Sequence, residues 1–259
     1  MRIAVCVGGW HWPLHLFRAL AAQADTDVDL FCIGHRSPDM AIVAHEANVG
    51  MKGAPAGPLG DLDRVLYEWV ASVGMLKELG WDFRLCDNTQ GDWGYVNQWL
   101  GLLDYTLFDA ILFLHDDTFL RRGDLFRHVR VCCEGEPNTL LWTNGRYPEA
   151  PLGYARGSFE IFRPELIQML GGKIPLAETG LDRTGKTDTP EGMDALSPWN
   201  ALGEPLRQFM NARGLKVGYL SEYYRVSEWA IEGERGFLHR MGGAPWSYTK
   251  GLKGLGLIP

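Results

Sequence analysis

Short apolar runs alternate with amphipathic segments through the first half of the 259-residue chain. The runs are short enough to be buried strands, and the residues at 111–114 are continuously hydrophobic, as in a strand in the middle of a sheet. They lie at residues 3–8, 28–34, 81–86 and 110–115. Between them, residues 61–79 repeat apolar side chains at helical spacing, from an N-cap at Asp61 to a stop at Gly80. Strand–helix alternation of this kind predicts an α/β protein with a mostly parallel central sheet flanked by helices.

The second half of the chain is less regular. Strands are expected at 139–144, 157–163 and 216–221, and helices from Pro164 to Gly172 and around 198–213. The length favours a single domain. Ligands of parallel sheets bind beyond the carboxyl ends of the strands, so the loops after Gly8, Gly34, Cys86 and Leu114 are expected to converge on one crevice.

Two adjacent carboxylates, Asp116 and Asp117, follow the most apolar strand in the sequence "AILFLHDDT". Buried carboxylates are costly unless they are paired or hold a cation. Oxygen ligands suit Mg²⁺ and Mn²⁺, which commonly link carboxylates to substrate phosphates. Taken alone, the dipeptide favours a simpler interpretation, a solvated polar turn, because short motifs occur often by chance.

The sequence around the dipeptide changes this balance. Asn88, Gly91 and Asn97 precede the apolar strand and "FLHDDT", and "GSFEIFRPELIQMLGG" follows at 157–172. In this order the elements resemble the GT-A-fold glycosyltransferases, especially the inverting family 2 enzymes, over roughly residues 1–230. The resemblance implies a GT-A (Rossmann-like) domain over 1–259. It would comprise a nucleotide-sugar half (1–120), an acceptor and catalytic half (121–239) and a tail or lid (240–259).

The resemblance also implies roles for individual residues. Asn88, Gly91, Asn97 and Asp116 would contact the nucleotide sugar, and Asp117 would bind Mn²⁺ or Mg²⁺, because His115 stands where the family's motif has its first acid. His239 is a candidate second metal ligand, although a lone histidine near a chain end more often has no such role.

The turn after the first strand is a further candidate for nucleotide-sugar binding. Gly8 and Gly9 allow close backbone approach to a ligand, and Trp10 or His11 could stack on the base. The equally plausible alternative is a tight turn with Trp10 in the core.

An inverting transfer needs a carboxylate within reach of the acceptor hydroxyl. The family's usual Glu-Asp pair is missing, so the base must be sought among Asp182, Asp188, Glu191, Asp194 and Glu204. Asp194 is preferred because it shortly precedes Ser197 and Pro198, which suit a helix start, and Glu191 is next. An ordinary surface role is almost as plausible for each of these acids.

The charge and composition of the chain disfavour some classes of binding partner. A net charge of −7 disfavours broad attraction to nucleic acid or an anionic membrane. The five cysteines lack metal-ligand spacing and are typical of reduced core thiols, and neither a signal peptide nor a membrane span is recognisable. A cytoplasmic protein is therefore expected.

The resulting interpretation is a metal-dependent inverting transferase that uses a nucleotide diphosphate sugar, most simply UDP-linked, with an acceptor that the sequence does not identify. The alternatives are a non-catalytic nucleotide-sugar or carbohydrate-binding relative, a glycosyltransferase acting on modified DNA bases, and a nucleotidyltransferase. The last is disfavoured because "GGWHWPLH" contains no Lys or Arg.

Overall fold

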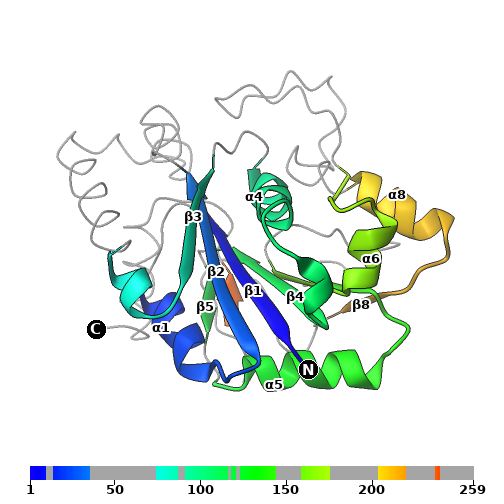
Figure 1. The fold of residues 1–259 in the computed structure, drawn as a ribbon. Coiled ribbons are helices and arrows are strands. Elements are labelled where there is room, and N and C mark those ends of the chain that lie inside the picture. The colour runs from blue at the N-terminus through cyan, green and yellow to red at the C-terminus, as the bar shows by residue number, and fades with distance from the viewer. Residues whose placement is uncertain are drawn as a thin grey trace, which may run out of the picture.

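The chain folds around a seven-stranded mixed sheet, seen here in a computed structural model (Figure 1). The structure describes residues 1–9, 14–35, 74–86, 91–115, 118–120, 123–143, 159–175, 204–219 and 237–239. The sheet has the order β3-β2-β1-β4-β7-β6-β8.

Four parallel strands form one side of this sheet. They are β1 (Ile3–Gly9), β2 (Val28–His35), β3 (Asp82–Cys86) and β4 (Ala110–His115). The chain runs from β1 outward to β2 and β3 and then returns to β4 on the other side of β1. This reversal of direction creates a topological switch point between β1 and β4, the place where sheets of this class bind ligands.

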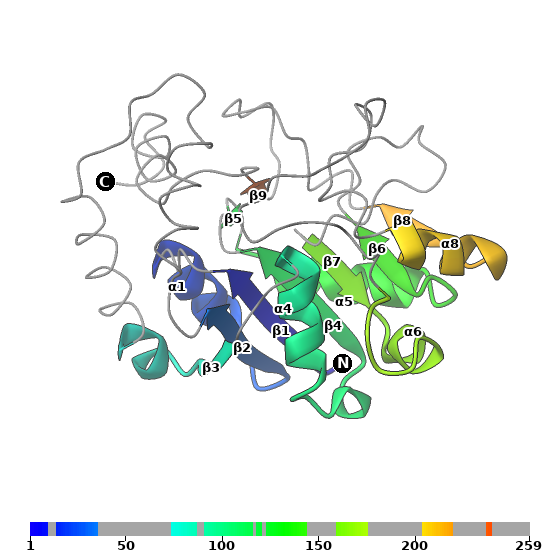
Figure 2. The same ribbon diagram turned by 90° about the horizontal axis from the view of Figure 1, so that it is seen from above.

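The other side of the sheet is mixed. β7 (Phe159–Phe162) runs antiparallel to both β4 and β6 (Leu141–Thr143), and β8 (Val217–Tyr219) runs parallel to β6. A separate two-stranded antiparallel sheet joins β5 (Thr118–Leu120) to β9 (Phe237–His239) (Figure 2). The expected α/β class with a mostly parallel central sheet is confirmed.

Helices cover both faces of the sheet. The described ones are α1 (Leu14–Gln23), α4 (Gly91–Leu100), the 3₁₀ helix η1 (Tyr105–Leu107), α5 (Leu125–Gly135), α6 (Pro164–Met169) and α8 (Glu204–Ala212). No helix in these parts of the chain is both long and apolar enough to cross a bilayer.

Alternation along the strands divides the interior into two cores. In β1, Ile3, Val5 and Val7 pack with α1 and α5, whereas Ala4 and Cys6 pack with α4, α6 and α8 on the other face. Successive side chains of a strand point to opposite faces, so an entirely apolar strand serves both cores. This explains why the most hydrophobic runs of the sequence became the central strands.

α4 is followed by η1, where the Asp104 carboxylate accepts a hydrogen bond from the Thr106 N–H. Two helices expected from the sequence are described in part. Of the helix expected at 61–79, residues 74–78 are described as helical, and Gly80 ends it at φ +83°. The helix expected around 198–213 is described as α8, and Gly214 follows it at φ +60°.

None of the cysteine side chains that the structure describes forms a disulfide. Cys6, Cys32 and Cys133 are buried, and Cys132 is partly exposed. Burial raises the pKa of the Cys133 thiol to about 11. This thiol therefore stays protonated and inert at neutral pH, as expected for a core cysteine.

Candidate functional site

The carboxyl ends of β1, β2 and β4 meet at one edge of the sheet. Gly8 pairs with His115 of β4, and Gly9 pairs with Gly34 of β2. The strand ends that lead into the loops after Gly8, Gly34 and Leu114 therefore meet as expected, and the loops themselves lie outside the described residues. His115 is the last residue of β4, so the chain leaves the switch point at Asp116 and Asp117, which lie outside the described residues.

The small β5–β9 sheet brings a distant segment to the same place. Thr118, which follows Asp117 in the sequence, pairs with His239 of β9. The pair of strands lies on the α1 side of the main sheet, because Leu120 packs against that core and α1 contacts β5 (Figure 2). The backbone of His239 is therefore held beside the residue that follows the candidate metal ligand Asp117.

Gly8 is required by the packing around it. A Cβ at Gly8 would lie 2.7 Å from Phe113 Cε2 and 2.9 Å from Tyr95 Cβ. Such contacts are too short for any side chain, so the absence of one lets the Phe113 ring and α4 approach β1 closely. The sequence predicted that Gly8 lets a ligand approach the backbone. The structure shows that the packing of Phe113 and Tyr95 also requires a glycine here.

Asn97 makes its described contacts with the protein itself. Its Nδ2 donates a hydrogen bond to the Ile174 carbonyl (3.0 Å), and the Ile174 N–H donates to its Oδ1 (2.7 Å). A direct contact between Asn97 and a nucleotide sugar remains a prediction, but both ends of the carboxamide already have a partner. Gly91, another predicted contact, is the first residue of α4.

Buried polar side chains near the ligand edge were missed by sequence reasoning. Glu160 is fully buried on β7, level with Phe113 of β4 and Thr143 of β6. Thr143 Oγ1 donates a hydrogen bond to Glu160 Oε1 at 3.4 Å. The signal was present in the sequence, because "SFEIF" places a carboxylate within an apolar strand, where an unpaired charge is costly.

Thr118 is the second such group. Its side chain is fully buried, and among the described residues no group hydrogen-bonds to its Oγ1. A buried hydroxyl without a partner is unusual in a native protein. A polar group or water that hydrogen-bonds to the Thr118 hydroxyl, at the start of β5, would therefore be favourable.

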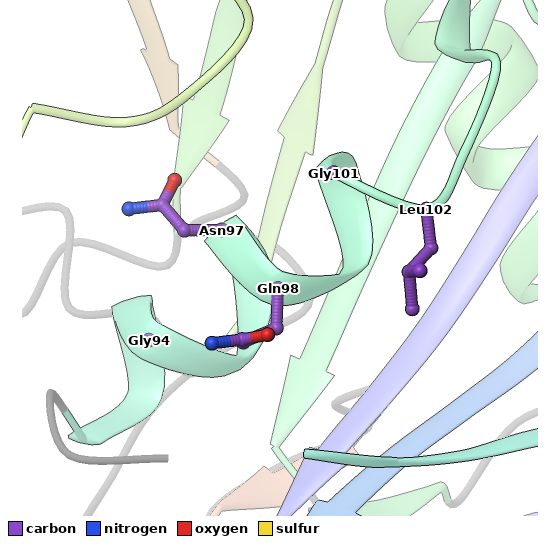
Figure 3. Close-up of a pocket in the computed structure, with 5 residues that line it drawn as sticks. All are labelled: Gly94, Asn97, Gln98, Gly101 and Leu102. Atoms are coloured by element: carbon purple, nitrogen blue, oxygen red, sulfur yellow. The ribbon is translucent and has the colours of Figure 1, made fainter. Parts of the chain in front are cut away.

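Described residues line pockets at two places on the molecule. One, of about 260 Å³, runs along the outward side of α4 and is lined by Gly94, Asn97, Gln98, Gly101 and Leu102 (Figure 3). The other, of about 380 Å³, lies at the amino ends of β1 and β4, opposite the ligand edge. It includes Asp109, Cys133 and Arg163. Neither pocket is formed by the strand ends of the switch point.

The remaining sequence candidates fall outside the described residues. They are Trp10, Asn88, Asp116, Asp117, Asp182, Asp188, Glu191 and Asp194. Glu204 begins α8. Within the described part of the chain, no three His, Cys, Asp or Glu side chains gather as a metal site. The predicted roles of these residues stay predictions.

The sequence matches no protein-family model and no curated protein. Among solved structures, the chain is similar to TarS (residues 1–349) of S. aureus, with 12% identity and a TM-score of 0.47 over 98% of this chain and 64% of that one. It is similar to the glycosyltransferase GlyE of Streptococcus pneumoniae TIGR4, with 13% identity and a TM-score of 0.47 over 96% and 59% of the two chains.

A third similar structure is a glycosyltransferase involved in the glycosylation of the major capsid of PBCV-1, with 9% identity and a TM-score of 0.40 over 98% and 99% of the two chains. This chain spans less than two thirds of the TarS and GlyE chains. At such identities and TM-scores, the likeness decides neither activity nor substrate, which must come from this chain's own residues.

Proposed function

We propose that this chain is a glycosyltransferase that moves a sugar from a nucleotide diphosphate sugar to an acceptor hydroxyl, with inversion at the anomeric carbon. The observation that carries the proposal is the pairing of Thr118 with His239. The pairing brings β9, which contains a histidine, close to the end of β4, where the chain continues into Asp116 and Asp117. Histidine is a residue type that commonly binds metals. That strand end lies at the switch point of an α/β sheet, where nucleotides commonly bind.

The residues available there fit a hard or borderline divalent cation. Carboxylates suit Mg²⁺ and Mn²⁺, and an imidazole is compatible with Mn²⁺ more readily than with Mg²⁺. Asp117 would hold the ion, with His239 as the second protein ligand. A bound cation would supply neutralisation of the diphosphate as it leaves. The buried Thr118 hydroxyl, for which the described residues provide no hydrogen-bond partner, directly follows Asp117 in the chain and is a polar group that an ion-bound water could satisfy.

The donor would lie over the ends of β1 and β4. Gly8 and Gly9 keep the end of β1 free of side chains, and Asp116 would accept hydrogen bonds from the ribose of the donor. Gly91 begins α4, and the N–H groups of a first helical turn favour phosphate oxygens. Asn88 and Trp10 would complete the nucleotide contacts.

The acceptor hydroxyl would lose its proton to a carboxylate on the face of the sugar opposite the diphosphate. Asp194 is the proposed base and Glu191 the alternative. The C–O bond to the acceptor forms as the bond to the diphosphate breaks, and the proton passes to the carboxylate. The donor is most simply UDP-linked, and the acceptor stays open among saccharides, small molecules, proteins and lipid-linked glycans.

A panel of UDP-, GDP- and TDP-sugars, incubated with and without Mn²⁺, tests this function by release of the nucleotide diphosphate. Turnover of one donor that requires the cation is expected, and Asp117→Asn should remove it. Asp82→Asn is the matched control, since Asp82 is an exposed aspartate at the opposite edge of the sheet, paired with Arg84. Donor binding without turnover in any condition would instead favour the non-catalytic alternative.

A further inference from the structure

The side chain of Asn97 links two parts of the chain that are far apart in sequence. Asn97 lies on α4, and its carboxamide contacts both backbone groups of Ile174, the N–H at 2.7 Å and the carbonyl at 3.0 Å. Ile174 is buried, and the hydrogen bonds are partly buried. This two-point contact reproduces, with a side chain, the pairing that a neighbouring strand would provide.

The turn that follows α6 delivers Ile174 to this position. Gly171 and Gly172 both adopt positive φ angles, +77° and +89°. Their N–H groups donate to the carbonyls of Gln168 and Ile167, which closes the end of α6. Two consecutive residues with positive φ require glycine, so the sequence "GG" encodes a sharp reversal that directs Ile174 onto α4.

The contact joins the two regions that the proposed reaction must bring together. α4 begins at Gly91, in the segment proposed to bind the donor. Ile174 shortly precedes the acid-rich segment that contains Glu191 and Asp194 in the sequence. Asn97 therefore holds Ile174 in place relative to the donor region. The chain continues from Ile174 toward the candidate base.

We propose that Asn97 is a positioning residue for the catalytic base and makes no essential contact with the donor. This inference rests on the proposed transferase function. Asparagine is suited to the role because its carboxamide presents one donor and one acceptor in a fixed geometry. Aspartate would keep the acceptor for the Ile174 N–H but would place an oxygen against the Ile174 carbonyl, and alanine would lose both bonds.

Three measurements on Asn97→Ala and Asn97→Asp test the inference. The affinity for UDP with Mn²⁺ should stay within about twofold of the wild type, while kcat with UDP-sugar falls by about tenfold or more and KM for the donor changes little. Hydrogen exchange of the Ile174 amide, measured without ligands, should accelerate strongly in Asn97→Ala and less in Asn97→Asp, which keeps an acceptor for this N–H. Asn97→Asp keeps one hydrogen bond and provides a folded variant if Asn97→Ala is unstable.

Gln98→Ala is the matched control. Gln98 carries the same functional group one residue along, is exposed, and leaves α4 in a different direction from Asn97 (Figure 3). This variant should retain kcat and the protection of the Ile174 amide.

Two results would overturn the inference. Loss of UDP affinity as large as the loss of kcat would make Asn97 a donor contact, and unchanged kcat with faster Ile174 exchange would make the link purely structural. A wild-type protein that transfers no sugar at all would instead refute the proposed function itself, and this inference with it.

Discussion

The ring of Phe113 occupies the space beside Gly8 that a side chain at that position would need. A Cβ there would lie 2.7 Å from Phe113 Cε2 and 2.8 Å from Cζ. Gly8 lies on β1 and Phe113 on β4, the two strands that border the switch point. Gly8 therefore has two effects. It lets the Phe113 ring pack against β1, and it leaves the ligand edge of the sheet without a side chain at this position.

Gly8→Ala should destabilise the fold. The new methyl group must displace the Phe113 ring and the Cβ of Tyr95 on α4, and overpacking of this kind typically costs about 1–3 kcal/mol. Chemical denaturation of the variant and the wild type measures the difference. Phe113→Leu in the Gly8→Ala background should recover part of the loss, because the smaller side chain leaves room for the methyl group.

Gly135→Ala serves as the control for this substitution. Gly135 ends α5, and nothing lies within 4 Å of a Cβ built there. Alanine should be neutral or stabilise by up to about 1 kcal/mol, since it restricts the unfolded chain and favours helix. An equal loss of stability in both variants would contradict the packing account of Gly8.

A bidentate ion pair between Asp25 and Arg130 predicts a pH-dependent contribution to stability. Arg130 contacts Asp25 at 2.8 Å (Nη1–Oδ2) and 2.9 Å (Nη2–Oδ1), which ties the segment after α1 to α5. The hydrogen bond from Arg130 lowers the pKa of Asp25 below its ordinary value of 3.8. A carboxyl with a lowered folded pKa stabilises above its unfolded pKa, and the contribution is lost as the pH falls through the folded pKa.

Asp25→Asn should therefore lower stability by up to about 1 kcal/mol at pH 7, as expected for a half-exposed pair. The gap to the wild type should shrink below pH 3.8 and vanish once the wild-type carboxyl is protonated. Thermal unfolding at several pH values between 7 and 3 measures this gap. A difference that stays constant over this range would show that Asp25 acts through its shape and not its charge.

Local patterns predicted the strands well and the long-range pairing poorly. The runs around Ile3 and Ile111 are apolar at every position because both faces of the sheet are covered, a property visible in any short window. The helix at 125–135 was overlooked although Leu125, Phe126, Val129 and Cys133 have helical spacing and are all buried. That signal was available in the sequence.

Other features of the site could not be read from local sequence. The pairing of β5 with β9 joins segments that are far apart in the chain, and neither three-residue strand has a distinctive pattern. The antiparallel direction of β7 depends on the path of the connecting chain. Asn97 matched a family pattern, yet its partner Ile174 lies in another part of the sequence, so its contact with the protein was not foreseeable.

The candidate base predicts a selective loss of turnover. Asp194→Asn should lower kcat by at least about 10²-fold, the lower end of what a positioned base supplies, while the affinity for UDP-sugar stays nearly unchanged. The amide keeps the shape of the carboxylate and removes its basicity. Single-turnover kinetics and a separate binding titration measure the two quantities.

Glu191→Gln is the internal comparison for that experiment. If Glu191→Gln abolishes transfer and Asp194→Asn remains active, the base is Glu191. Full activity of both variants would move the assignment to Asp188 or Glu204.

Calorimetric titration of the wild type with UDP, in Mn²⁺ and in EDTA, tests the central claim most directly. The account predicts binding in Mn²⁺ that weakens by at least tenfold in EDTA, because Asp117 and His239 hold the cation that neutralises the diphosphate. Asp117→Ala should lose this dependence and His239→Ala should weaken it, with both variants retaining the wild-type circular dichroism spectrum. Equal UDP affinity with and without the cation, in the wild type, would contradict the metal site at the end of β4.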